Sequence, residues 1–235
     1  PPVPHWPLVP PRDPEAIRIL SEAYFSSNYN IGHMLKVIFA SDFFKSENVR
    51  MARVKSPAEL VVGTYRLTGG FEYPEADGLK PDGSGPALGQ ELLNPKFSYE
   101  SSRASTAMGQ YLLNPPSVEG WYGGSDWINT GAMVERINFA SARFGNTDRP
   151  GVRSIIDIVK STAGGEAMSP EALVDACLDQ LCMFDVSEVT LKELTHYARK
   201  WGNMDFSDSS KAVEAERNVV AMLQIIMATK EYQLV

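Results

Sequence analysis

Apolar residues recur at three- and four-residue spacing through most of the chain, which is the pattern of amphipathic α-helices. The predicted helices are residues 14–27, 31–44, 57–67, 101–113, 126–144, 152–161, 170–183, 188–201 and 210–229, with a short turn or helix at 88–94. No segment keeps the apolar and polar alternation of a β-strand. We therefore predict an all-α protein, an irregular multi-helix globular bundle of about eight to ten helices with one long Gly/Pro loop.

Polar residues mark the starts of several predicted helices. Ser56 precedes Pro57 and, three positions on, Glu59, which together form a capping box. Comparable caps precede other helices at Asp13, Asn30, Ser169 and Ser187, and Ser125 or Asp126 is the expected cap of the helix that ends near residue 144. Gly63 lies inside a helix at a cost of about 1 kcal/mol relative to alanine, so we expect a second helix to approach closely there.

Proline and glycine punctuate the chain and indicate its organisation. Residues 1–13 are proline-rich and predict an extended arm, either a partner contact or a linker from a preceding domain. Residues 69–88 form the long Gly/Pro loop, and residues 145–151 break the chain again. We predict a helical subdomain at 14–146 that carries an aromatic Gly/Pro loop, and a C-terminal helical subdomain at 151–235 packed on the first.

The aromatic loop lies near the middle of the chain and supplies the candidate contact residues. Trp121, Tyr122 and Trp127 fall within seven residues, next to two consecutive prolines and several glycines that shape the backbone. Such aromatic side chains either plug the loop into the core or present a flat surface to a ligand or partner. Burial is the commoner arrangement, and the second one would make these three residues a binding surface.

Charge and composition exclude some classes of function. The net charge is −7 and no cluster of Lys and Arg is present, so nucleic acid is not an expected partner. No apolar run reaches the roughly 18 residues of a membrane span, and the first residues do not resemble a signal peptide, although an upstream signal that has been removed stays open. Cys177 and Cys182 are expected to be reduced core residues of one helix, which favours the cytoplasm.

The chain contains no recognisable catalytic or metal-binding motif. Its three histidines are far apart and lack the spacing of zinc ligands. Asn203, Asp205, Ser207, Ser209 and Glu214 match several positions of a calcium loop, but Asp208 occupies the position that requires glycine, so we expect an ordinary loop. We predict no metal and no cofactor and assign no catalytic residue. Arg136 is expected to be a solvated charge, with burial against an acid elsewhere in the chain as the alternative.

Several longer motifs resemble one known family. They include Asn114-Pro-Pro-Ser-Val-Glu-Gly-Trp121, Val134-Glu-Arg-Ile-Asn-Phe-Ala140, the Val54–Thr64 segment and the closing Ala228–Leu234 segment. In this order they are similar to the C-terminal part of the bacterial proteins catalogued as domain of unknown function 1800 (DUF1800). The resemblance implies no agreed activity, substrate or cofactor, and it implies that members are usually longer than this chain.

Two functional hypotheses follow. The first is a helical scaffold or interaction domain, as the C-terminal half of a longer protein or one part of a complex, whose partner is the family's N-terminal half or another protein chain. The second is part of a hydrolase for an envelope or carbohydrate substrate, with Trp121, Tyr122 and Trp127 stacked on a sugar and Glu119 and Asp126 nearby. Without a catalytic motif, the first hypothesis is preferred over an enzyme.

Overall fold

The computed structural model describes residues 13–69, 96–183 and 185–235 and confirms the predicted all-α class. These residues form ten α-helices and three short 3₁₀ helices, and their only β-type pairings are isolated bridges. The chain divides into two compact units, Pro1–Arg53 with Val235, and Val54–Leu234. Residues 1–12 of the predicted arm, most of the Gly/Pro loop and the short element at 88–94 lie outside the described residues.

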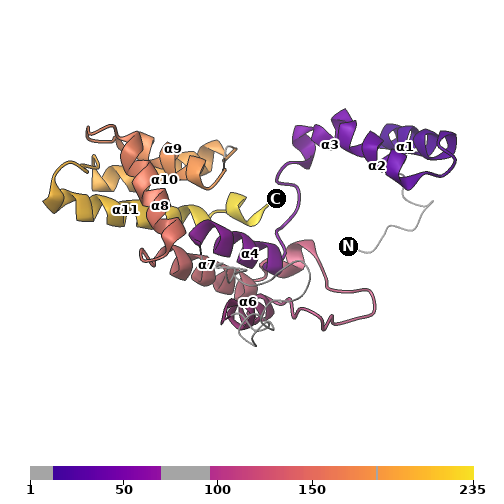
Figure 1. Ribbon diagram of the computed structural model, residues 1–235, viewed down its shortest axis with the longest axis horizontal. Coiled ribbons are helices and arrows are strands. Elements are labelled where there is room, and N and C mark those ends of the chain that lie inside the picture. The colour runs from indigo at the N-terminus through magenta and orange to yellow at the C-terminus, as the bar shows by residue number, and fades with distance from the viewer. Residues whose placement is uncertain (1–12, 70–95, 184) are drawn as a thin grey trace, which may run out of the picture. The chain divides into compact units, whose positions relative to one another are not determined.

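The first unit contains a pair of antiparallel helices followed by two short ones (Figure 1). The Asp13 carboxylate and the Asn30 side chain cap its first two helices, as predicted, by accepting from the N–H groups of Ala16 and His33, each at 2.9 Å. The predicted helix at 31–44 is interrupted at Ser41, whose extended backbone starts a new helix. The elements are α1 (Pro14–Ser26), α2 (Ile31–Ala40), α3 (Asp42–Lys45) and η1 (Glu47–Val49).

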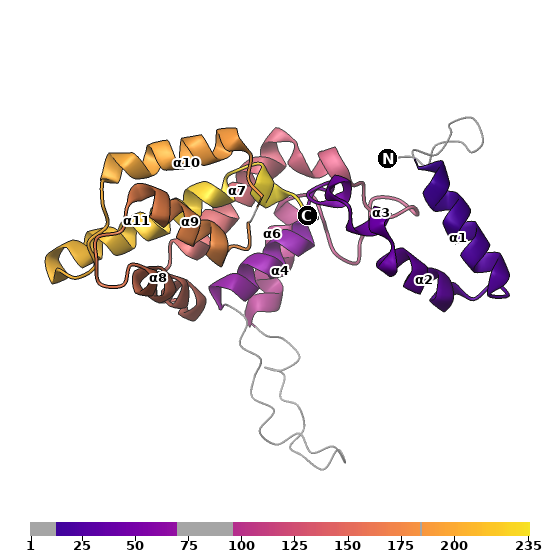
Figure 2. The ribbon, with the colours of Figure 1, turned by 90° about the horizontal axis from the view of Figure 1, so that it is seen from above.

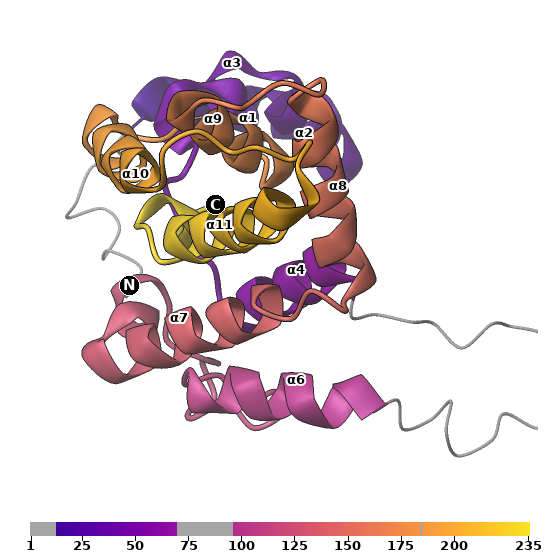
Figure 3. The same ribbon diagram turned by 90° about the vertical axis from the view of Figure 1, so that its left-hand side faces the viewer.

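The second unit is built around its last long helix, α11 (Ser209–Met227), which packs on four other α-helices (Figures 2 and 3). Those four are α7 (Thr130–Phe144), α8 (Pro150–Thr162), α9 (Pro170–Gln180) and α10 (Glu188–Trp201). On the far side of α7, α4 (Pro57–Thr68) packs on α6 (Lys96–Ala107). Two short 3₁₀ helices complete the unit, η2 (Gly124–Ile128) and η3 (Glu231–Gln233).

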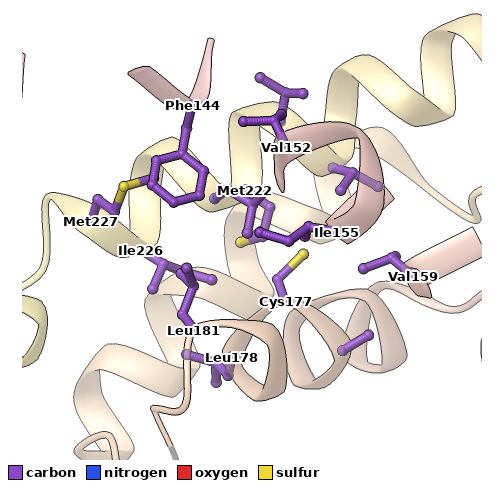
Figure 4. Packing of buried hydrophobic residues seen from close by; sticks show 14 of the residues in the cluster. Phe144, Val152, Ile155, Val159, Cys177, Leu178, Leu181, Met222, Ile226 and Met227 are labelled. Atoms are coloured by element: carbon purple, nitrogen blue, oxygen red, sulfur yellow. The ribbon is translucent and has the colours of Figure 1, made fainter. Parts of the chain in front are cut away.

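One hydrophobic core runs through this unit, and Figure 4 shows side chains of α7, α8, α9 and α11 meeting in it. In α8 the buried positions are Val152, Ile155, Ile156 and Val159, the spacing of one helical face. The C-terminal half of α11 is buried on most sides, as its sequence predicts. The core includes residues from both sides of the break at 145–151, so the subdomain boundary proposed there stays a prediction.

Three further helices have ends that differ clearly from the predicted ones. Helix α6 begins at Lys96 and ends at Ala107, before Gly109 adopts a φ of +96°. The cap of α7 is Asn129, which accepts from the N–H of Ala132, because residues 124–128 form the 3₁₀ turn η2 instead of the helix start. Helix α9 ends at Gln180, so Cys182 lies outside the helix and is exposed, whereas Cys177 is buried as expected.

Glycines allow α4 and α8 to touch, but not at the glycine that the sequence indicated. A Cβ atom placed on Gly151 would lie 2.2 Å from the Leu67 carbonyl oxygen and 2.6 Å from the Gly69 nitrogen. The close approach therefore occurs at the C-terminal end of α4. A Cβ atom on Gly63 would have no neighbour within 4 Å, so the expected helix contact at that position is wrong.

We predict that Gly63→Ala stabilises the protein. The added methyl group meets open space, and alanine loses less backbone entropy than glycine when a helix forms. The free energy of unfolding should rise by about 0.5–1 kcal/mol, measured by urea denaturation followed by circular dichroism. A decrease would mean that Gly63 has a packing role which the structure does not contain.

Candidate functional site: an exposed apolar surface and a buried arginine network

The aromatic loop is held by internal hydrogen bonds, and its three aromatic residues differ in exposure. The Trp121 indole N–H donates to the Tyr111 carbonyl at 3.1 Å, which ties the two sides of the loop together. Trp121 and Trp127 are half-buried, whereas Tyr122 is exposed. The loop is thus neither fully plugged into the core nor fully open, and Trp121 helps to shape it. A contact role for these three residues stays a prediction.

The same loop exposes aliphatic side chains. Leu113 and Val118 are fully exposed, and Leu113 has a φ of +66°, which is unfavourable for a side chain with a Cβ atom. A turn closed by the Gly120 N–H on the Ser117 carbonyl, at 3.1 Å, supports the tip. Glu119 and Asp126 are exposed. Within the described residues, no observation at this loop favours a hydrolase.

The first unit exposes many large apolar side chains. Of the side chains described between residues 13 and 53, only Ala23 is buried. Large apolar side chains are exposed instead; they are Ile17, Phe25, Tyr29, Ile31, Leu35, Phe39, Phe44 and Val49. Helices with this composition normally cover their apolar side with another element.

Three of these residues form a continuous line, which we call the α2 stripe. Ile31, Leu35 and Phe39 follow one another at four-residue spacing and therefore occupy one side of α2. Their exposed fractions are 59, 43 and 57%. The Phe39 ring meets the Phe44 ring edge-on with centroids 5.2 Å apart, which extends the apolar surface onto α3. The amphipathic pattern of α2 is visible in the sequence, but its exposure is not.

A buried arginine network lies in the second unit, where the sequence predicted a solvated charge. Arg136 is fully buried, so that prediction is wrong. Its Nε donates to the Gln233 side-chain oxygen and its Nη2 to the Lys55 carbonyl, each at 2.8 Å. The Lys55 ammonium in turn donates to the Tyr232 carbonyl at 2.7 Å and lies over the Tyr232 ring. This network holds the C-terminal segment against the start of α4 and the middle of α7.

Burial changes the acid–base properties of this network. Desolvation lowers the pKa of Arg136 from its ordinary value. Desolvation, together with the nearby Arg136 charge, also lowers the pKa of Lys55. The Arg136 Nη1 atom is buried without a hydrogen-bond partner. Through the Lys55 ammonium and the Arg136 guanidinium, the network holds two backbone carbonyls, those of Tyr232 and Lys55.

The segment that resembles a calcium loop is occupied by contacts among its own residues. Hydrogen bonds from Ser207 and the Lys211 ammonium lower the pKa of Asp205 to about 2. A cavity of about 90 Å³ beside it is lined by Trp201, Asn203, Met204, Asp205, Lys211, Glu214, Ala215 and Asn218. The lysine places a positive charge where a cation would bind. Across the described ranges, no group of three or more His, Cys, Asp or Glu side chains is arranged to hold a metal ion.

The fold and these features define an all-α protein with one extended core and a separate helix pair that presents an apolar surface. A family model described as protein of unknown function (DUF1800) matches residues 8–234. The chain therefore belongs to the DUF1800 family. No match was found among curated proteins or among solved structures.

The family match also corrects one expectation. The sequence motifs indicated a resemblance to the C-terminal part of the family alone, whereas the match extends over nearly the whole chain and is not limited to such a part.

None of the helices in the described residues is both long and apolar enough to span a membrane.

Proposed function

We propose that this protein is a helical interaction domain whose α1–α2 pair binds a helix of another protein chain through the α2 stripe. The observation that carries the proposal is the exposure of eight large apolar side chains between residues 13 and 53. Clustered exposed apolar side chains usually mark a binding surface. The line formed by Ile31, Leu35 and Phe39 has the spacing with which an amphipathic helix is recognised.

The chemistry of the stripe specifies the partner further. Lys36 is the only charged residue of α2, and it lies about 100° around the helix from Leu35. The stripe can therefore bind a partner through apolar contacts and complementary shape. We expect the partner to present a helix whose surface is rich in leucine, isoleucine or phenylalanine. Membrane-surface helices commonly carry Lys and Arg along their polar face, and α2 does not.

A pair of matched variants tests this function. Leu35→Glu places a charge in the middle of the stripe, whereas Leu191→Glu places the same charge on α10 at a leucine exposed by 38%. A partner that co-purifies from the native source is produced separately and titrated calorimetrically against each variant. We expect Leu35→Glu to weaken binding by at least about 30-fold and Leu191→Glu to leave it unchanged. Equal affinity for both variants would refute the proposal.

A further inference from the structure

The described residues of the first unit bury almost no core of their own, because Ala23 is their only buried side chain. Helices with so little buried apolar surface are normally stabilised by a disulfide, a metal or association with another chain. Both free cysteines, Cys177 and Cys182, lie in the second unit. The ring contacts of Tyr24 with Phe25 and Tyr29 order the α1–α2 turn, yet Phe25 and Tyr29 stay exposed. An additional layer of helices would bury them.

The α2 stripe is complementary to itself. Leu35 is its midpoint, with Ile31 one turn before and Phe39 one turn after. In an antiparallel pair of α2 helices related by a two-fold axis, Leu35 meets its own counterpart, and each Ile31 faces the Phe39 of the other copy. Residues at four-residue spacing form one of the two kinds of ridge through which helices pack in four-helix bundles. The stripe thus presents the contacts of an isologous interface.

The distribution of charge favours the same arrangement. Residues 13–53 contain five basic and five acidic side chains, so this segment is neutral, whereas the chain as a whole carries −7. Arg18 forms ion pairs with Glu15 and Glu22 of its own helix, and Arg50 pairs with Glu47. Two copies that meet through this segment therefore bring no net charges of the same sign together, whereas the remaining surface, with all the excess acid, would repel its copy.

We propose that the partner of the α2 stripe is a second copy of this chain, and that two α1–α2 pairs associate around a two-fold axis into a four-helix bundle. This inference rests on the proposed function, because it names the partner of the same surface. Leu35 lies at the centre of the interface, and Phe25, Tyr29 and Phe39 become buried in it.

The test measures the oligomeric mass of each variant and asks whether variants of opposite charge associate. Light scattering after gel filtration, across about 1 to 100 μM protein, is expected to give a dimer for wild type and for Leu191→Glu, and a monomer for Leu35→Glu and for Leu35→Lys. Mixing Leu35→Glu with Leu35→Lys should restore a dimer, because the two-fold axis brings the opposite charges together. Restoration on mixing cannot arise from misfolding of either variant, and circular dichroism verifies that each one is folded.

The outcomes separate this inference from the function on which it rests. A monomeric wild type that binds a different helical protein through Leu35 overturns the second-copy inference and retains the interaction function. A dimer that Leu35→Glu leaves intact overturns the two-fold arrangement. A wild type that neither self-associates nor binds any protein through the α2 stripe overturns both.

Discussion

Replacing Gly151 with alanine is expected to lower the free energy of unfolding by about 3 kcal/mol, because the added methyl group collides with backbone and not with a movable side chain. The new Cβ atom would lie 2.2 Å from the Leu67 carbonyl oxygen and 2.5 Å from the Thr68 carbonyl carbon. Either α8 or the end of α4 must shift, and both contribute to the single core. Urea denaturation measures the change.

Gly63→Ala is the matched control, because it adds the same methyl group to the same pair of packed helices and has the opposite expected sign. The two variants together separate helix propensity from steric contact. If Gly151→Ala remained within about 0.5 kcal/mol of wild type, the close approach of α4 and α8 would be wrong.

The second large effect is expected for Arg136→Met, which should lower the free energy of unfolding by about 3 kcal/mol. Methionine fills much of the space, but it leaves the Gln233 side-chain oxygen and the Lys55 carbonyl without their donor. Removing a buried charge whose Nη1 atom has no partner offsets part of this loss. The Gln233 side chain also donates to the Met227 carbonyl. Without Arg136 this side chain loses one of its two hydrogen-bond partners, and we expect the C-terminal segment to become less ordered.

Arg217→Met is the control, because Arg217 is exposed on α11 and its replacement should change stability by less than about 0.5 kcal/mol. Hydrogen exchange provides a second measurement. Backbone amides of residues 231–234 should lose protection in Arg136→Met and keep it in Arg217→Met. Unchanged protection and stability in Arg136→Met would show that the buried arginine network does not hold the segment.

Local signals in the sequence predicted the helices well, because capping is short-range chemistry. The Ser56 capping box is present, with the Ser56 N–H donating to Glu59 at 2.7 Å and the Glu59 N–H donating to Ser56 at 3.2 Å. The caps at Asn30, Ser169 and Ser187 were also predicted from the sequence and are present in the structure. The start of α7 was missed because a 3₁₀ turn and an α-helix begin with similar residues, and only tertiary packing selects between them.

Long-range features were not predictable in the same way. Arg136 looks like a surface residue beside Glu135, and its burial depends on Lys55 and Gln233, which are far away in the sequence. One signal was available: Lys55, Arg136 and Gln233 each lie in a motif that resembles the DUF1800 family. The structure brings these separate motifs to one place, so part of what identifies the family stabilises its fold.

The exposure of the α2 stripe also could not be predicted from the sequence. An amphipathic pattern shows which residues share a side of a helix, but not which element covers that side. For the aromatic loop the sequence left two arrangements open, and the structure is intermediate, with Trp121 and Trp127 half-buried and Tyr122 exposed.

Leu113 combines an unfavourable backbone conformation with a fully exposed apolar side chain. Glycine at this position would relieve the strain, and a polar residue would suit the water around it. Selection for thermal stability alone would therefore replace this leucine early in a directed-evolution experiment. A selection that also demanded the protein's biological activity, and that retained Leu113, would measure directly how much the exposed loop matters to the cell.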